Sequence, residues 1–200
     1  MIKKIILFVL LLSLLLGCSD KQNKSRYNAK KTNTEQEIKK LPQKEIEKLF
    51  NAALNNKGEI IAKYIEEGGD PDILNSNGQT LLMYAAYNGH TDLCEYLLRR
   101  DADISTKDNE GRTALMYAST GPFSETVKLL LENNAKPNVI DNKENWTALM
   151  FAASEGEAEV VRILLNYGAD ATLKDIDGDT AESFAKQKGH IEVVKILTEH

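Results

Sequence analysis

Three histidines and two cysteines are the side chains of this 200-residue chain best suited to nucleophilic, acid–base or metal chemistry. His90 and His190 each follow a glycine, and His200 is the last residue given, so their spacing places no nucleophile beside a base. Cys94 stands on the apolar face of a predicted helix, where the equivalent positions are valines. We therefore expect Cys94 to be a small buried hydrophobe and the protein not to be an enzyme.

An acidic run at 175–179, with the sequence DIDGD, raises the question of a calcium loop. An EF-hand loop needs an oxygen ligand at its first position, glycine at its sixth and glutamate at its twelfth. Here Leu173 and Phe184 would take the first and twelfth positions, and neither binds Ca²⁺. The sequence also lacks the Gly-Lys loop that holds phosphates. We expect no metal site, no cofactor and no small-molecule substrate.

Cys18 follows a segment with the pattern of a signal peptide. Lys3 and Lys4 precede an aliphatic run from 5 to 16, which as a helix would reach roughly 18 Å, short of the roughly 30 Å hydrocarbon core. Cleavage is therefore expected rather than a transmembrane span. The sequence Leu15-Leu16-Gly17-Cys18 resembles the lipobox of bacterial lipoproteins. The alternative is an ordinary secretory signal with an incidental cysteine.

The lipoprotein resemblance implies removal of residues 1–17 and attachment of a diacylglyceryl group to the Cys18 thiol. Several acyl chains anchor a protein stably, whereas one does so only marginally. In a bacterium with two membranes, Ser19 resembles an outer-membrane sorting signal, with Asp20 one position late for inner-membrane retention. The expected location is thus the bacterial membrane, with the outer membrane facing the periplasm favoured.

Residues 18–42 contain almost no large apolar side chains and carry seven Lys/Arg against three Asp/Glu. Such a segment buries too little surface to offset its ordering entropy. The composition therefore predicts a flexible tether with a reach of roughly 25–30 Å.

A motif of about nine residues recurs through the rest of the chain, and the elements that it forms must position any binding residues. GQTLLMYAA at 78–86 returns as GRTALMYAS at 111–119, as NWTALMFAA at 145–153 and, degraded, as GDTAESFAK at 178–186. Its threonines are spaced by 33, 34 and 33 residues, and each of the first three copies is followed by a second helix with a Leu-Leu run. In period and residue types these copies resemble ankyrin repeats.

The resemblance implies an all-α repeat solenoid of about five helix–turn–helix units with hairpin loops, the outer two acting as caps. The expected units are approximately 43–74, 75–107, 108–140, 141–174 and 175–200. Each threonine is expected to cap its first helix. Two irregularities are predicted: a reshaped turn at 121–123 (GPF), and an irregular hairpin before Trp146, where Asn145 replaces a glycine and one residue is inserted.

Ankyrin proteins bind through hairpin tips and the exposed ends of first helices, so the resemblance implies a partner-binding face here. The main candidates by register are Gln79, Tyr87, Asn88, Arg112, Glu144, Trp146, Glu155 and Tyr167. Trp146, the only tryptophan, stands where other copies are polar, and we interpret it either as a binding anchor or as a side chain patching the inserted loop. An aromatic column, Tyr84, Tyr117, Phe151 and Phe184, is either a ligand stripe or partly buried packing.

Charge narrows the class of partner. Residues 43–200 carry 16 basic against 27 acidic side chains, which disfavours nucleic acid. The acidic charge either attracts a basic protein partner or only keeps the domain apart from its neighbours in solution. The sequence thus predicts a membrane-anchored adaptor binding an unidentified protein in the cell envelope. Specialised alternatives are an immunity protein against a secreted toxin and a periplasmic factor supporting oxidative-stress defence. An effector delivered into host cells is a further alternative, which a covalent lipid anchor disfavours.

Overall fold

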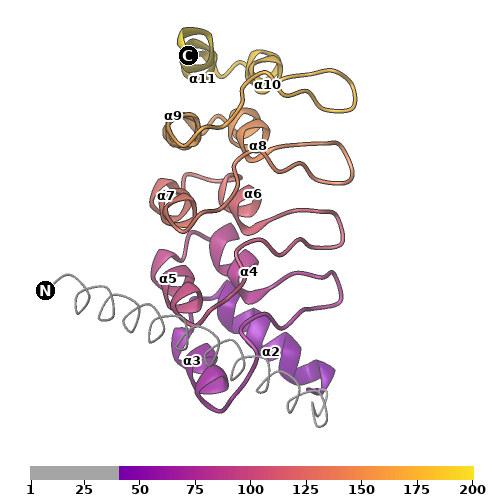
Figure 1. Cartoon of the computed structure of the whole chain (residues 1–200), viewed down its shortest axis with the longest axis vertical. Coiled ribbons are helices and arrows are strands. Elements are labelled where there is room, and N and C mark those ends of the chain that lie inside the picture. Colours follow the sequence, from indigo (N-terminus) through magenta and orange to yellow (C-terminus); the bar gives the residue numbers. More distant parts are fainter. Residues whose placement is uncertain (1–40) are drawn as a thin grey trace, which may run out of the picture. The chain divides into compact units, whose positions relative to one another are not determined.

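Antiparallel helix pairs make up residues 41–200, the part of the chain that this computed structural model describes. Figure 1 shows the pairs stacked in two rows, with hairpin loops projecting to one side. Residues 41–200 contain ten helices and no strand, which confirms the predicted all-α solenoid. The proposed signal peptide, Cys18 and the tether up to residue 40 lie outside the described residues.

The ten helices form five units, and Gln43–His200 is one compact body. Each unit has a first helix and a second helix. In chain order the pairs are α2 (Gln43–Leu54) with α3 (Gly58–Glu66), α4 (Leu81–Tyr87) with α5 (Thr91–Arg99), α6 (Ala114–Ala118) with α7 (Ser124–Glu132), α8 (Ala148–Glu155) with α9 (Ala158–Asn166), and α10 (Ala181–Lys188) with α11 (Ile191–Glu199).

Threonine caps fix where four of the first helices begin. Thr80 Oγ1 accepts from the Met83 backbone N–H at 3.2 Å, and Thr113, Thr147 and Thr180 act in the same way. The Thr80 N–H in turn donates to the Met83 sulfur at 3.4 Å, so methionine closes a reciprocal cap. α2 has Glu47 at the equivalent position, and without that stop the helix starts earlier, at Gln43.

Small residues let the first helices pack closely, while aliphatic residues fill the space between the rows. Ala85 and Ala86 are fully buried, and so are Leu97 and Leu164 of the second helices. Cys94 is also fully buried, which confirms the prediction for it, and this burial raises the pKa of its thiol to about 12. The core is therefore a continuous apolar layer that neighbouring units share.

The turn of the third unit is reshaped, as the sequence predicts. α6 stops at Ala118, and the Ser119 hydroxyl donates to the Leu115 carbonyl at 2.8 Å. The Phe123 ring packs against Gly89 of the preceding unit, where an added Cβ would lie 2.1 Å from the ring. Gly89 also has φ +66°, so only glycine fits this contact without strain.

Four hairpin loops, here called the fingers, comprise residues 75–79, 108–112, 141–146 and 175–179. The first residue of each accepts backbone N–H groups of its own finger, as Asp108 Oδ1 does from Glu110 and Arg112 at 2.9 and 2.8 Å. Backbone hydrogen bonds also link neighbouring fingers, including Asn109 N–H to the Asn77 carbonyl at 3.0 Å. The site is therefore built on loops that brace each other.

Candidate protein-binding surface

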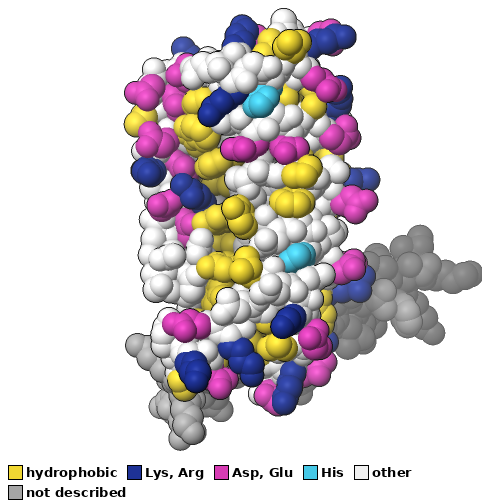
Figure 2. Space-filling view, turned by 180° about the vertical axis from the view of Figure 1, so that it is seen from behind, with side chains coloured by type: hydrophobic (Ala, Val, Ile, Leu, Met, Phe, Trp, Pro, Cys, Tyr) yellow, Lys and Arg dark blue, Asp and Glu magenta, His cyan; other side chains and the backbone are white. Residues whose placement is uncertain are grey.

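A row of aromatic rings runs along the first helices beside the fingers, and all of them except the buried Phe184 are at least partly exposed. We call it the aromatic band; its members are Tyr84, Tyr87, Tyr117, Trp146, Phe151 and Phe184. The rings meet edge-on or tilted, with centroids 4.4–6.0 Å apart in the pairs Tyr87–Tyr117, Trp146–Phe151 and Trp146–Phe184. Figure 2 shows a band of hydrophobic side chains along the face seen from behind.

One position in each of the first three fingers bridges to the aromatic ring of the next unit. Gln79 Nε2 donates to the Tyr117 hydroxyl at 2.6 Å, and the Arg112 guanidinium lies 5.7 Å from the centroid of Phe151. Trp146 packs on Phe184 at 4.4 Å. The chemistry of each bridge matches its target, since the amide meets a hydroxyl while the guanidinium and indole meet bare rings.

These contacts between units were not predicted from the sequence, although the paired residue types can be found in the repeats. The residue before the capping threonine pairs with the aromatic residue of the next unit three times: Gln79 with Tyr117, Arg112 with Phe151 and Trp146 with Phe184. The aromatic column is therefore partly buried packing, while its outer edge stays accessible to solvent.

Trp146 has intermediate exposure and lies between the rings of Phe151 and Phe184. The inserted finger residue is accommodated by Asp141, whose Oδ1 accepts the Trp146 N–H at 3.2 Å together with two other N–H groups of the finger. Asn145 adopts φ +59°, as expected of a residue in place of the glycine. The indole thus packs against rings of two units and remains partly exposed.

Tyr117 anchors a buried polar network under the band. Its hydroxyl donates to Asp108 Oδ2 at 2.6 Å and accepts from Gln79. Desolvation and the Asp108 carboxylate together raise the pKa of Tyr117 to about 12, because both disfavour a phenolate there.

The other candidates divide between two surfaces. Tyr87 is 52% exposed on the band, Asn88 beside it donates to the Tyr84 carbonyl at 2.9 Å, and Glu144 and Glu155 are solvent-accessible. Arg112 is held by Glu110 at 2.7 Å. Tyr167 caps α9 in the second-helix row, and its hydroxyl donates to Glu132 of α7 at 3.4 Å. Tyr167 is therefore not part of the band.

His90 and His190, both partly exposed, have structural roles. His90 Nε2 donates to the Leu54 carbonyl and His190 Nε2 to the Ser154 carbonyl, each at 3.0 Å, which ties a turn to the preceding unit. Asp175 Oδ1 accepts the N–H groups of its own finger. In residues 41–200 no group of three His, Cys, Asp or Glu side chains is arranged to hold a metal ion.

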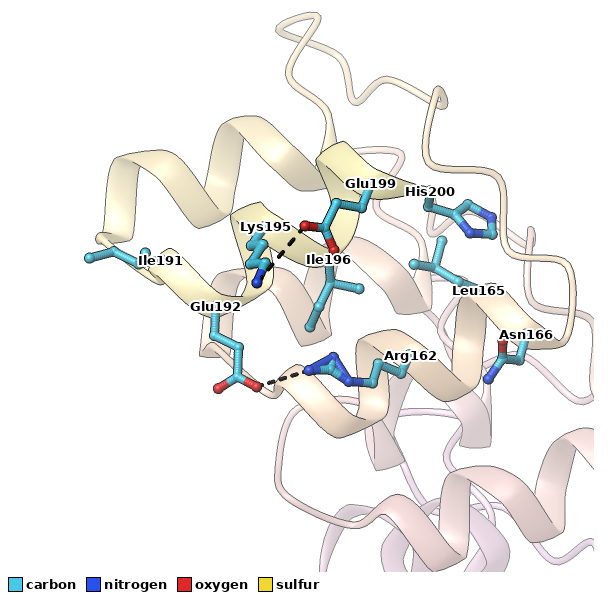
Figure 3. A pocket seen from close by; sticks show the side chains of 9 residues that line it. All are labelled: Arg162, Leu165, Asn166, Ile191, Glu192, Lys195, Ile196, Glu199 and His200. Atoms are coloured by element: carbon cyan, nitrogen blue, oxygen red, sulfur yellow. Dashed lines mark hydrogen bonds and ion pairs between the residues drawn. The ribbon is translucent and has the colours of Figure 1, made fainter.

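A hollow of about 770 Å³ lies between α9 and α11, away from the band (Figure 3). None of the predicted binding residues lines it. Its walls combine apolar side chains with two ion pairs: Leu165, Ile191 and Ile196, with Arg162–Glu192 at 3.0 Å and Lys195–Glu199 at 3.9 Å. Among the helices of residues 41–200, none is long and apolar enough to cross a bilayer.

Comparison with known proteins agrees with this architecture. A search of curated proteins finds no match to the chain. The family model described as "Ankyrin repeats (3 copies)" matches residues 49–141 and 122–200, which together make up most of the chain. Repeats of this kind are generally protein-interaction modules without catalytic activity. The chain belongs to the ankyrin-repeat family.

Proposed function

We propose that this protein is a lipid-anchored adaptor of the bacterial cell envelope that binds a protein partner along the aromatic band. The observation that carries the proposal is a row of partly exposed rings on rigid helices, flanked by fingers that brace one another. Aromatic side chains give large contact area at low entropic cost, and they dominate the energetics of interfaces.

The anchor is the second part of the proposal, and it rests on the lipobox sequence that ends in Cys18. Acylation there, followed by the polar segment 18–42, would hold the repeats some tens of ångströms from the membrane, facing the periplasm. The test is labelling of cells that express the full chain with radioactive palmitate. We expect label on the wild type and none on Cys18→Ser; an unlabelled wild type would contradict the anchor.

Partner binding is tested with the full chain, purified in mild detergent, immobilised and exposed to a solubilised envelope fraction. We expect retention of one specific protein. Trp146→Ala should weaken its binding by about 1 kcal/mol or more. Tyr87→Ala is the cleaner variant, because Tyr87 is 52% exposed and meets the Tyr117 ring of the next unit at 6.0 Å, whereas Trp146 meets Phe184 at 4.4 Å. It should weaken binding at a smaller cost in stability.

The matched control lies on the opposite surface. Arg99→Ala removes an exposed side chain of α5, whose pairing with Glu95 in the same helix contributes little to stability. Retention unaffected by Tyr87→Ala, or lost equally with Arg99→Ala, would show that the partner does not use the band.

A further inference from the structure

Charge is distributed unevenly along the fingers. Residues 75–79 carry no charged side chain, whereas 175–179 carry three carboxylates and no cation. Between them, Glu110 and the buried Asp141 flank Arg112, at 2.7 and 4.0 Å. The surface beside the band therefore changes from neutral at the second unit to acidic at the fifth.

The acidic end has carboxylates to offer a ligand. Asp177 is exposed and Asp179 partly so, and among the described residues neither side chain enters a hydrogen bond or an ion pair. Asp175, in contrast, is committed to the backbone of its own finger. The finger that ends in Trp146 is joined to this one, because the Glu144 carbonyl accepts the Ile176 N–H at 3.1 Å.

The opposite end of the band is apolar. Leu54 and Tyr87 occupy the same position of successive first helices, 33 residues apart, and are 39% and 52% exposed. His90 connects their units through the Leu54 carbonyl. Two exposed large hydrophobics at equivalent positions of neighbouring units favour an apolar ligand group at this end.

The chain itself contains the contact that a basic ligand would make. The Arg112 guanidinium stacks over Phe151 of the band while a carboxylate, Glu110, holds its outer nitrogen at 2.7 Å. Trp146 is the next bridging side chain along the band, and tryptophan is the strongest partner for a cation among aromatic residues. An incoming guanidinium could use Trp146 and the 175–179 carboxylates in the same way.

We propose that the band binds an extended protein segment with an apolar end at Leu54 and Tyr87 and an arginine-rich end at Trp146 and the 175–179 finger. This rests on the proposed function and adds the chemistry and orientation of the occupant. Charge complementarity sets the orientation, because a reversed segment would place its cations over a neutral finger and its apolar end against carboxylates.

The test uses the emission of Trp146, the only tryptophan of the chain, which reports occupancy of the acidic end directly. The probes are capped Gly/Ser peptides of about twelve residues, which reach roughly 40 Å when extended. One carries leucines at one end and arginines at the other, and its matched control carries glutamates in place of the arginines. They are titrated into the full-length chain in mild detergent, and the arginine peptide should bind at least about tenfold more tightly.

Asp177→Asn/Asp179→Asn should reduce that preference to about threefold or less, because it removes the two carboxylates with no other partner. Glu59→Gln/Glu125→Gln removes the same charge from exposed second-helix positions and should leave the preference unchanged. Equal binding of both peptides, no binding of either, or a preference that survives the Asp177/Asp179 change would overturn the inference.

The outcome is separable from that of the proposed function. If an envelope protein is retained through Tyr87 while the peptides show no charge preference, the adaptor proposal stands and the basic occupant is wrong. If the peptides discriminate as expected but no envelope protein is retained, the surface chemistry stands and the adaptor role is wrong.

Discussion

At Trp146 one side chain connects two units and also presents an edge to solvent. The same is true of Gln79 and Arg112, whose polar groups face the ring of the next unit. A residue in such a position affects stability and binding together, so a loss of binding in a variant has to be compared with its free energy of unfolding.

We expect Trp146→Ala to lower the free energy of unfolding by about 1–2 kcal/mol, because contacts with both Phe151 and Phe184 are lost. Trp146→Phe should cost less, since a ring remains. Urea denaturation followed by circular dichroism measures both. Tyr87→Ala is the control, and a cost equal to that of Trp146→Ala would contradict the bridging role.

The Tyr117 network predicts a pH dependence. The pKa of Tyr117 is raised from 10.0 to about 12 in the fold, so above pH 10 the unfolded chain releases this proton first. The stability that Tyr117 contributes is thus complete below pH 10 and is lost as pH rises toward 12. Burial also raises the pKa of the Cys94 thiol to about 12, so the wild type is compared with Tyr117→Phe, which keeps Cys94.

Denaturation series at pH 9 to 12 should show the stability difference between wild type and Tyr117→Phe shrinking as pH rises. A difference that stays constant across this range would mean that the hydroxyl is not held in its neutral form by Asp108.

Among the elements, the finger 141–146 departs most from its neighbours. In the first two fingers the linking carbonyl belongs to the residue two after the Asx residue, as in Asn77 and Glu110, whereas here it is Glu144, three after Asp141. The extra residue therefore lies between Asp141 and Glu144, and the links on both sides are kept. The finger tolerates the insertion because its backbone N–H groups converge on one carboxylate.

Asn145→Gly should stabilise the protein by about 0.5 kcal/mol, because glycine adopts φ +59° without the cost that a Cβ imposes. Lys143 lies in the same finger but does not have a positive φ, so Lys143→Gly should give no gain in stability. Thermal and urea unfolding of the two variants compare them directly. Equal effects at both positions would indicate that backbone strain at Asn145 is negligible.

The repeat sequence was sufficient to predict the helices, their threonine caps and both irregular segments, because these depend on local residue types in a fixed register. The bridges between units were not predicted, since Gln79 and Tyr117 are 38 residues apart and meet only after the units stack. Tyr167 was assigned to the binding face by register, but its own contacts place it with Glu132 on the second helices. Side-chain direction at helix ends decides such cases.

Across the whole repeat array, stability is approximately the sum of the contributions of the units and of the contacts between neighbouring units. The outer units of residues 43–200 have one neighbour each, and the middle units have two. The last unit has a polar outer side, where Glu182 is held by Lys186 at 2.9 Å and by the Thr198 hydroxyl at 3.0 Å.

Amide hydrogen exchange should therefore be slowest in α6 and α7 and faster in α2, α3, α10 and α11, because opening an end unit breaks one interface rather than two. Mass spectrometry of peptides from each unit measures this gradient. Uniform protection across all five units would mean that residues 43–200 open as a single cooperative block.

We propose that a protein partner lies on the aromatic band and its fingers. Photocrosslinking in living cells tests it most directly, with a photoreactive amino acid placed at Tyr87 or Ser154 on the first helices, and at Arg99 or Lys128 on the second helices as controls. We expect one specific adduct from the first pair and none from the second. Adducts from the second helices, with none from Tyr87 or Ser154, would contradict it.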